Sequence, residues 1–296
     1  MRDIGSPQSS TDCMTDILGR VKATFRKYSD FENTWKAAGL QRSEYFRLLR
    51  FPGGHLKPTT ILFRGFLTHF ASPYWFLHSV QEIFVDEVYK YSPSSSAPLI
   101  VDCGANIGLS VVYFKELAPN ARIVAFEPDP DVFDLLAKNI TGRSLTDVEI
   151  LNRAVWTDDS MLTFEVEGAL GGKVGRSEAV ARKSIEVRGQ RLRDLLDQEV
   201  DFLKLDIEGA EYSVLEDCRD KLENVRNLFV EFHGNTNEPQ QLDEILAWVK
   251  TAGFRYYITE ASKIQAHPFV SKGSPNDFDV QLNLSCYRPE KTGALR

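Results

Sequence analysis

The sequence has few cysteines, and their positions give no sign of a metal centre or a disulfide framework. The 296 residues include Cys13, Cys103, Cys218 and Cys286. These four form no CxxC pair, and no histidine accompanies them at the spacing of a zinc finger. Scattered thiols of this kind suit a reducing compartment, so we expect a cytoplasmic protein with no metal site.

The chain is also short of positive charge and of long apolar runs. Its 35 lysines and arginines stand against 42 aspartates and glutamates, which gives a formal net charge of −7. That balance produces no general attraction to nucleic acid or to an anionic membrane. The longest apolar region, residues 61–80, is interrupted by Arg64, His69, Pro73 and His78, so it is no candidate for a membrane span. We therefore expect neither nucleic acid nor a membrane as a partner.

A segment rich in serine and proline, residues 92–98, divides the chain into two unequal parts. Residues 1–20 lack the apolar stretch of a secretory signal and are expected to form a flexible leader. Residues 21–98 show helical periodicity, for example over 76–91, and this predicts a mostly helical cap that helps to select the substrate. Residues 99–290 are expected to form the main domain.

In the main domain, apolar strands alternate with amphipathic helices. The predicted strands are 99–103, 122–127, 148–154, 202–206, 228–232, 254–259 and 280–287. The predicted helices between them are 107–117, 131–140, 210–217 and 239–251. Such alternation predicts an α/β fold with a doubly wound parallel sheet that helices cover on both faces. Short alternating segments around several glycines within residues 161–187 predict an additional β-hairpin.

The first predicted strand leads into a glycine turn with the sequence Asp102-Cys103-Gly104-Ala105-Asn106-Ile107-Gly108. Gly104 lets the backbone turn sharply toward a ligand, Asn106 tolerates unusual backbone angles, and Gly108 permits close packing where the next helix begins. The turn has one residue too many between its glycines for the GxGxxG pattern of dinucleotide-binding enzymes. Asp102 would also repel a phosphate, whereas it suits the amino group of a methionine moiety.

The second predicted strand ends in Ala125-Phe126-Glu127-Pro128. An acidic side chain at this position can hold the hydroxyl groups of a ribose. Asp102 and Glu127 therefore predict a single ligand that carries an amino group and a ribose.

Two further motifs follow, Phe202-Leu203-Lys204-Leu205-Asp206-Ile207-Glu208-Gly209-Ala210-Glu211 and Phe229-Val230-Glu231-Phe232-His233. In order and spacing, the four motifs resemble the FkbM family of S-adenosylmethionine-dependent methyltransferases over residues 81–289. The resemblance implies a Rossmann-like class I methyltransferase with a seven-stranded, mostly parallel sheet and S-adenosylmethionine as cofactor. In related enzymes the end of the third strand covers the adenine edge, which makes Asn152 and Ala154 candidates for cofactor contact.

The charged segment at residues 204–211 is placed where the fourth strand ends, and open α/β sheets build their sites at this edge. Lys204 and Asp206 share one face of the strand. A lysine buried in a parallel sheet needs a carboxylate partner. The partners that we consider for Lys204 are Glu208, Glu211 and Glu231.

His233 follows the fifth strand on the same face as Glu231 and can accept a proton near neutral pH. We predict that Asp206, Glu208 and His233 are catalytic and that Asp206 also contacts the cofactor. A structural network of ion pairs is the alternative interpretation of these side chains.

The resemblance implies O-methylation of a hydroxyl group on a small molecule, such as a sugar, a polyketide or another secondary metabolite. Two other functions compatible with the motifs are a cofactor-binding protein without catalysis and an NAD-dependent oxidoreductase. Titration with S-adenosylhomocysteine and with NAD distinguishes the methyltransferase from the oxidoreductase.

Overall fold

A seven-stranded sheet forms the centre of the computed structural model, which describes residues 35–36, 38–50, 59–166, 172–174, 183–236, 238–262, 264–265, 267–270 and 278–289. The strand order is β12-β13-β11-β10-β3-β4-β5. The bounds are β3 Leu99–Cys103, β4 Arg122–Phe126, β5 Val148–Leu151, β10 Val200–Leu205, β11 Val225–Asn235, β12 Arg255–Ser262 and β13 Phe278–Tyr287. Strand β13 runs antiparallel to both neighbours, whereas the pairs from β11 to β5 are parallel. The predicted seven-stranded, mostly parallel sheet is confirmed.

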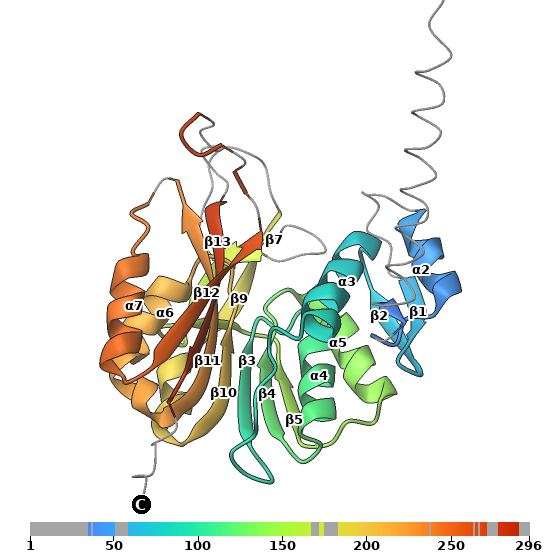
Figure 1. Cartoon of the computed structure of the whole chain (residues 1–296), viewed down its shortest axis with the longest axis horizontal. Helices are drawn as coiled ribbons and strands as arrows, with labels where there is room; N and C mark the ends of the chain where they lie inside the picture. Colours follow the sequence, from blue (N-terminus) through green and yellow to red (C-terminus); the bar gives the residue numbers. More distant parts are fainter. Residues whose placement is uncertain are drawn as a thin grey trace, which may run out of the picture.

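Helices cover both faces of this sheet, as the doubly wound prediction requires (Figure 1). On one side are α4 (Leu109–Leu117) and α5 (Pro130–Gly142), and on the other are α6 (Glu211–Cys218) and α7 (Leu242–Thr251). Buried apolar side chains fill the two interfaces as separate clusters. Strands that are buried on both faces explain the nearly continuous apolar runs in their sequences.

The chain reverses its direction of travel across the sheet between β3 and β10. From β3 it proceeds through β4 to β5 at one edge, and it later returns to β10 and continues to β11 on the other side. In open α/β sheets such a switch point leaves a crevice at the carboxyl ends of the strands, where ligands bind. The turns that follow β3 and β10 are therefore the expected location of the site.

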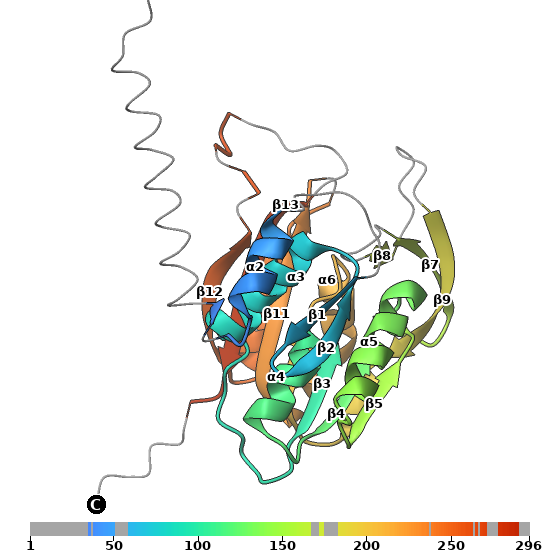
Figure 2. The ribbon, with the colours of Figure 1, turned by 90° about the vertical axis from the view of Figure 1, so that its right-hand side faces the viewer.

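The segment before the sheet is helical in part and also contains a β-hairpin. Its elements are α2 (Arg42–Leu49), β1 (Thr59–Phe63), β2 (Phe66–Phe70), α3 (Pro73–Val80) and the π-helix η2 (Gln81–Val85). The periodicity predicted a helix over residues 76–91, but the helical region ends at Val85. The β-hairpin was not predicted from the sequence. Figure 2 shows this segment (blue) on the side of the sheet that carries α4 and α5. Asn139 of α5 fixes it there, because its side chain bonds to both the N–H and the carbonyl of His69. The predicted leader, 1–20, lies outside the described residues.

A second, four-stranded sheet follows β5. It has the order β6-β9-β7-β8, with β6 at Ala154–Trp156, β7 at Met161–Val166, β8 at Gly172–Val174 and β9 at Lys183–Arg191. Strands β7 and β9 are antiparallel, so the hairpin predicted within 161–187 is confirmed, while most of its tip lies outside the described residues. The short helices η3 (Leu192–Asp197) and η4 (Arg219–Asn224) complete the fold. Across the described ranges, we find no helix of the length and apolarity that crossing a membrane requires.

Candidate active site

The glycine turn after β3 lies against the end of β10. Its backbone takes left-handed angles at Gly104 (φ +85°), Asn106 (φ +48°) and Gly108 (φ +88°). A Cβ atom on Gly104 would overlap the carbonyl oxygen of Asp206, so this contact admits only glycine. The backbone N–H of Asp206 in turn donates to the Cys103 carbonyl at 3.1 Å. The turn and the first residue after β10 therefore form one continuous wall of the crevice.

Glu127, at the end of β4, faces the same turn. Its two carboxylate oxygens accept hydrogen bonds from the backbone N–H groups of Asn106 and Asp129, each at 2.9 Å. Burial raises the pKa of Glu127 to about 8. Asn152, after β5, donates its side-chain amide to the carbonyls of Glu127 and Pro128 at 2.8 and 2.9 Å. These candidates thus meet at the carboxyl edge of β3, β4 and β5, and their contact with a cofactor stays a prediction.

Ala154, another residue predicted to contact the cofactor, belongs to the second sheet rather than to the carboxyl edge of the main sheet. It is the first residue of β6, and it packs in a small apolar cluster of the second sheet with Leu162, Phe164 and Val187. Its role at the adenine edge also stays a prediction.

A buried ion pair links β3 to β10 beside the glycine turn. Asp102 and Lys204 are partners in the strand register, and Lys204 Nζ lies 3.5 Å from Asp102 Oδ1. The same ammonium group donates to the Gly104 carbonyl at 2.8 Å and to Asp206 Oδ2 at 3.1 Å. Burial alone would lower the pKa of Lys204, but Asp206 and Asp102 raise it well above its ordinary value. Lys204 is therefore a cation that joins the turn to β10.

The partner of Lys204 is a correction to the sequence analysis. Glu208, Glu211 and Glu231 were the candidates, whereas the structure pairs Lys204 with Asp102 and Asp206. The carboxylate of Asp102 has no exposed surface, and it also accepts a hydrogen bond from Ser110 Oγ at 2.6 Å. Asp206 keeps 24% of its side chain exposed, so it is the acid of this pair that a ligand can reach. Direct contact between Asp102 and a methionine amino group stays a prediction.

The three predicted catalytic residues converge at the ends of β10 and β11. One donor atom from each of Asp206, Glu208 and His233 lies within 4.8 Å of the others. His233 Nε2 is 3.5 Å from Glu208 Oε2 and 3.5 Å from Glu231 Oε1. The imidazole is buried, whereas 30% of the Glu208 side chain is exposed. Glu208 therefore presents its carboxylate at the mouth of the cluster and His233 supports it from inside.

The protonation states of the side chains in this cluster depend on their burial and on how close they lie to one another. Burial alone would lower the pKa of His233, but Glu211, Glu231 and Glu208 raise it well above its ordinary value, so the imidazole carries both protons. Burial raises the pKa of Glu208 to about 8, and neighbouring carboxylates add to the rise. The sequence analysis gave His233 the ability to accept a proton, but a doubly protonated ring has no lone pair for one. Glu208 is the group of the cluster that can exchange a proton near neutral pH.

The same protonation bears on metal binding by these residues. A divalent cation would need the lone pair of a neutral imidazole and an ionised carboxylate. His233 instead places its two ring nitrogens against Glu211 and against the carboxylates of Glu208 and Glu231. In this arrangement the carboxylates are hydrogen-bond partners of the imidazole, and Asp206, Glu208 and His233 lie close enough together that they could also hold a metal ion.

The N-terminal segment has a histidine–carboxylate pair between α3 and η2. His78 Nδ1 lies 3.2 Å from Glu82 Oε2. The hydrogen bond to Glu82 raises the pKa of His78 above its ordinary value, and the charge of Glu231 adds to the rise.

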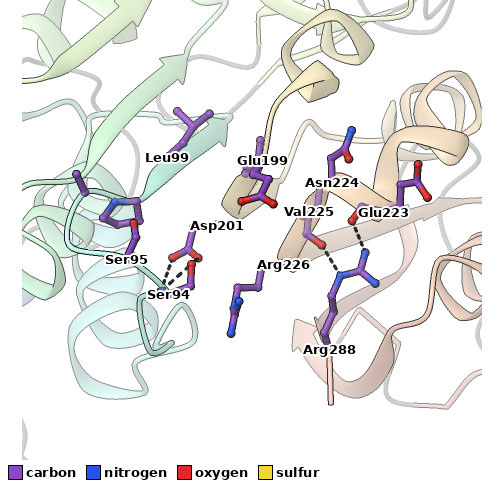
Figure 3. Close-up of a pocket in the computed structure, with 13 residues that line it drawn as sticks. Ser94, Ser95, Leu99, Glu199, Asp201, Glu223, Asn224, Val225, Arg226 and Arg288 are labelled. Carbon is purple, nitrogen blue, oxygen red and sulfur yellow. Dashed lines mark hydrogen bonds between the residues drawn. The ribbon is translucent and has the colours of Figure 1, made fainter. Parts of the chain in front are cut away.

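The opposite edge of the sheet has a hollow of its own. A cavity of about 370 Å³ opens at the amino ends of β3, β10 and β11 (Figure 3). Asp201 accepts hydrogen bonds there from the Ser94 backbone and hydroxyl, and Arg288 donates to backbone carbonyls that include Val225. The residues that line this cavity form hydrogen bonds with one another. The cavity lies at the amino ends of the strands, whereas Asp206 and the glycine turn lie at the carboxyl ends. Apart from Ala154, the predicted site residues lie at the opposite, carboxyl edge of the sheet.

Comparison with known proteins points to the same segment of the chain. A model of the methyltransferase FkbM domain matches residues 102–256, which begin at the buried ion pair and include the whole acidic cluster. Methyltransferase sdnD of Sordaria araneosa is 33% identical over 211 residues, with 59% of this chain and 80% of that protein covered. Methyltransferase 1 of Beauveria bassiana is 28% identical over 170 residues, with 49% and 68% covered. Hexuronic acid methyltransferase AglP of Haloferax volcanii is 29% identical over 153 residues, with 50% and 61% covered.

Proposed function

The chain belongs to the FkbM methyltransferase family, and we propose that it transfers the methyl group of S-adenosylmethionine to a hydroxyl oxygen of a small molecule. The observation that carries the proposal is the meeting of the glycine turn with Asp206 and Glu208 at the switch point of the sheet. This meeting puts a turn suited to a nucleoside beside a carboxylate that can take up a proton.

Charge supports S-adenosylmethionine as the cofactor. The buried and partly buried groups around the turn and the end of β10 include more carboxylates than cations: Asp102, Asp206, Glu208, Glu211 and Glu231 against Lys204 and His233. An excess of negative charge at a partly closed site favours a ligand that brings positive charge. S-adenosylmethionine does so, because it carries an ammonium group and supplies a methyl group on a sulfonium sulfur. A dinucleotide brings phosphates, which such a site repels, so the oxidoreductase alternative is disfavoured.

The chain's own residues divide the work of O-methylation. Glu208 accepts the proton of the acceptor hydroxyl, which leaves the oxygen free to take the methyl group. The His233 imidazolium, 3.5 Å from Glu208, stabilises the ionised form of that carboxylate. Lys204 keeps Asp206 and the glycine turn in fixed relative positions. Most of the rate enhancement then comes from holding the reacting atoms in line.

A small polar acceptor is supported by one relative and by the partly exposed carboxylates of the acidic cluster. AglP is named for a hexuronic acid, which is a sugar with several hydroxyl groups. In this chain the acidic cluster includes partly exposed carboxylates, with Glu208 30% and Glu231 18% exposed. Carboxylates of this kind accept hydrogen bonds from hydroxyl groups. We therefore propose a hydroxylated small molecule as the acceptor.

The Glu208→Gln variant tests the proposal. Calorimetry with S-adenosylhomocysteine measures cofactor affinity, and radiolabelled S-adenosylmethionine measures transfer to a panel of neutral sugars, phenols and D-glucuronic acid. We expect Glu208→Gln to lower turnover about a hundredfold or more, because a general base contributes on the order of 10²–10⁴-fold. Its affinity for S-adenosylhomocysteine is expected to stay within about threefold of that of the unmodified protein, since the amide keeps the size of the side chain.

The control for this test is Glu149→Gln, at an exposed position in β5 on the far edge of the sheet. It should leave both turnover and affinity unchanged. If Glu208→Gln keeps full turnover, Glu208 is not the base. If titration with S-adenosylhomocysteine releases no heat, the assignment of the cofactor is wrong. Tight cofactor binding without transfer to any compound tested would favour the non-catalytic alternative.

The pH dependence of the reaction gives a separate prediction. Because Glu208 must be ionised to accept a proton and its pKa is raised to about 8, we expect kcat/KM to rise with pH through about 8. Below that value each pH unit should lower kcat/KM about tenfold, because the ionised fraction falls tenfold. Steady-state rates measured from pH 6 to 10 check this, with Glu149→Gln as the control that keeps the profile. A profile that is flat between pH 6 and 8 would contradict it.

A further inference from the structure

Glu211 is the most completely engaged side chain of the acidic cluster, and the mechanism above gives it no role. It is the first residue of α6 and is 1% exposed. Its Oε1 accepts the backbone N–H of Ile207 at 3.1 Å and that of Gly209 at 3.1 Å, and its Oε2 accepts the latter at 3.0 Å. The same Oε1 lies 3.0 Å from His233 Nδ1. One carboxylate thus joins a turn and a ring from two different strands.

The turn that Glu211 holds has a conformation that needs support. Glu208 has φ +56° and Gly209 has φ +100°. A side chain larger than glycine rarely adopts a left-handed angle, and such angles persist only where the surroundings fix them. The two backbone N–H groups that Glu211 accepts flank Glu208 on either side. The direction in which Glu208 presents its carboxylate therefore depends on Glu211.

The ring of His233 is fixed by the same carboxylate. The Nδ1 side meets Glu211, and Nε2 then faces Glu208 and Glu231 at equal distances of 3.5 Å. The ring of Phe278, on β13, packs against the imidazole with 4.7 Å between centroids. Without Glu211, the contacts that remain would no longer determine which ring nitrogen points at Glu208.

We infer that Glu211 is a positioning residue, which orients both His233 and the turn that carries Glu208 for removal of the acceptor proton. It touches neither acceptor nor cofactor in this role and acts through its two neighbours. The functional half of this inference rests on the proposed O-methylation. The structural half, the Glu211–His233 contact, is independent of it.

The charges around the imidazole agree with this assignment. The carboxylates near it are Glu211 from α6, Glu208 from the turn, Glu231 from its own strand and, within 4.8 Å, Asp206 at the end of β10, while Phe278 on β13 brings no charge. Among these, the charge of Glu211 contributes the largest rise to the pKa of His233. Neutralising Glu211 should therefore bring the imidazolium closer to its neutral form at physiological pH.

Glu211→Gln tests the inference, because glutamine keeps an oxygen for the backbone N–H groups and removes the charge. Nitrogen-15 NMR of the histidine rings, with His233 assigned by comparison with His233→Gln, should show both ring nitrogens protonated at pH 8 in the unmodified protein. In Glu211→Gln the ring should lose a proton at a pH at least one unit lower. With the most active acceptor of the panel, kcat should fall about a hundredfold, as misplacement of a reacting group by about 1 Å does. KM and the affinity for S-adenosylhomocysteine should change less than about threefold.

Glu216→Gln is the matched control, since Glu216 lies on the same helix with 50% of its side chain exposed. It should leave the NMR titration and kcat unchanged. An unchanged His233 titration in Glu211→Gln, or an unchanged kcat, would overturn the inference. If no acceptor is methylated, the proposed function fails while the NMR result still decides the structural half. If Glu211→Gln does not fold, a His233 ring in the unmodified protein that lacks a hydrogen-bonded Nδ1 proton at pH 8 overturns it, and a bonded proton supports it.

Discussion

Replacing Gly104 by alanine is expected to abolish binding of S-adenosylhomocysteine. Gly104 has φ +85°, and a Cβ atom there would overlap the carbonyl oxygen of Asp206. Backbone atoms cannot move aside as the end of a flexible side chain can, so the turn and the end of β10 must separate. That movement would also break the hydrogen bond from Lys204 to the Gly104 carbonyl. Calorimetry should therefore detect no binding of S-adenosylhomocysteine to Gly104→Ala.

Gly65→Ala provides a matched control for Gly104→Ala. Gly65 has φ +83°, yet an added Cβ would meet nothing within 4 Å. Both variants carry the cost of a left-handed backbone on alanine, about 1–2 kcal/mol of unfolding free energy. Only Gly104→Ala adds a collision inside the site. Equal loss of stability in the two variants, with intact binding in Gly104→Ala, would contradict the assignment of the turn to the cofactor.

The strands of the main sheet were predictable because their signals are local. Strand β3 begins and ends at the predicted residues, and β4 ends one residue earlier than predicted. Buried parallel strands are continuous apolar runs, and the glycine turn marks where β3 stops. The third strand was predicted as a single segment through Ala154, but it ends at Leu151. Beyond that point the side-chain amide of Asn152 donates to the Glu127 carbonyl that follows β4. No local sequence pattern reveals this contact.

The β1–β2 hairpin shows a different reason for a missed element. Its two-residue turn has Arg64 at φ +51° and Gly65 at φ +83°. Two positive angles define the hairpin turn that asparagine or aspartate followed by glycine usually signals. Arginine is an uncommon choice there, and tertiary contacts hold it, with its guanidinium donating to the Ala38 carbonyl and to Glu116. The glycine between two apolar runs was the available signal, and it was weak.

The residues of the candidate site could be named from the sequence, but the contacts between them could not. The four motifs named Asp206, Glu208, Glu231 and His233, and the structure gathers them. The partner of Lys204 depends on strand register, which places Asp102 opposite it. The protonation of His233 depends on Glu211, which reaches it from α6, the helix before β11. Both relations join different secondary-structure elements, so they require the folded structure.

Replacing Lys204 by methionine is expected to destabilise the fold more than any other single charge removal considered above. Lys204 is 2% exposed and its register partner Asp102 is fully buried. Methionine fills much of the lysine's volume, but among the residues that the structure describes it leaves the Asp102 carboxylate with the Ser110 hydroxyl as its one remaining partner. Removing one member of a buried pair leaves an uncompensated charge and costs about 3–5 kcal/mol. Urea unfolding should show a loss of this size.

Lys221→Met is the control, because Lys221 pairs with Asp197 at 2.6 Å on the surface, with 69% of the Asp197 side chain exposed. An exposed pair contributes about 0–1 kcal/mol, so this variant should unfold almost as the unmodified protein does. Adding Asp102→Asn to Lys204→Met removes the stranded charge and should recover more than half of the lost stability. Recovery would show that the loss arises from the buried carboxylate. Equal stability of the Lys204 and Lys221 variants would instead mean that Lys204 does not hold β3 and β10 together.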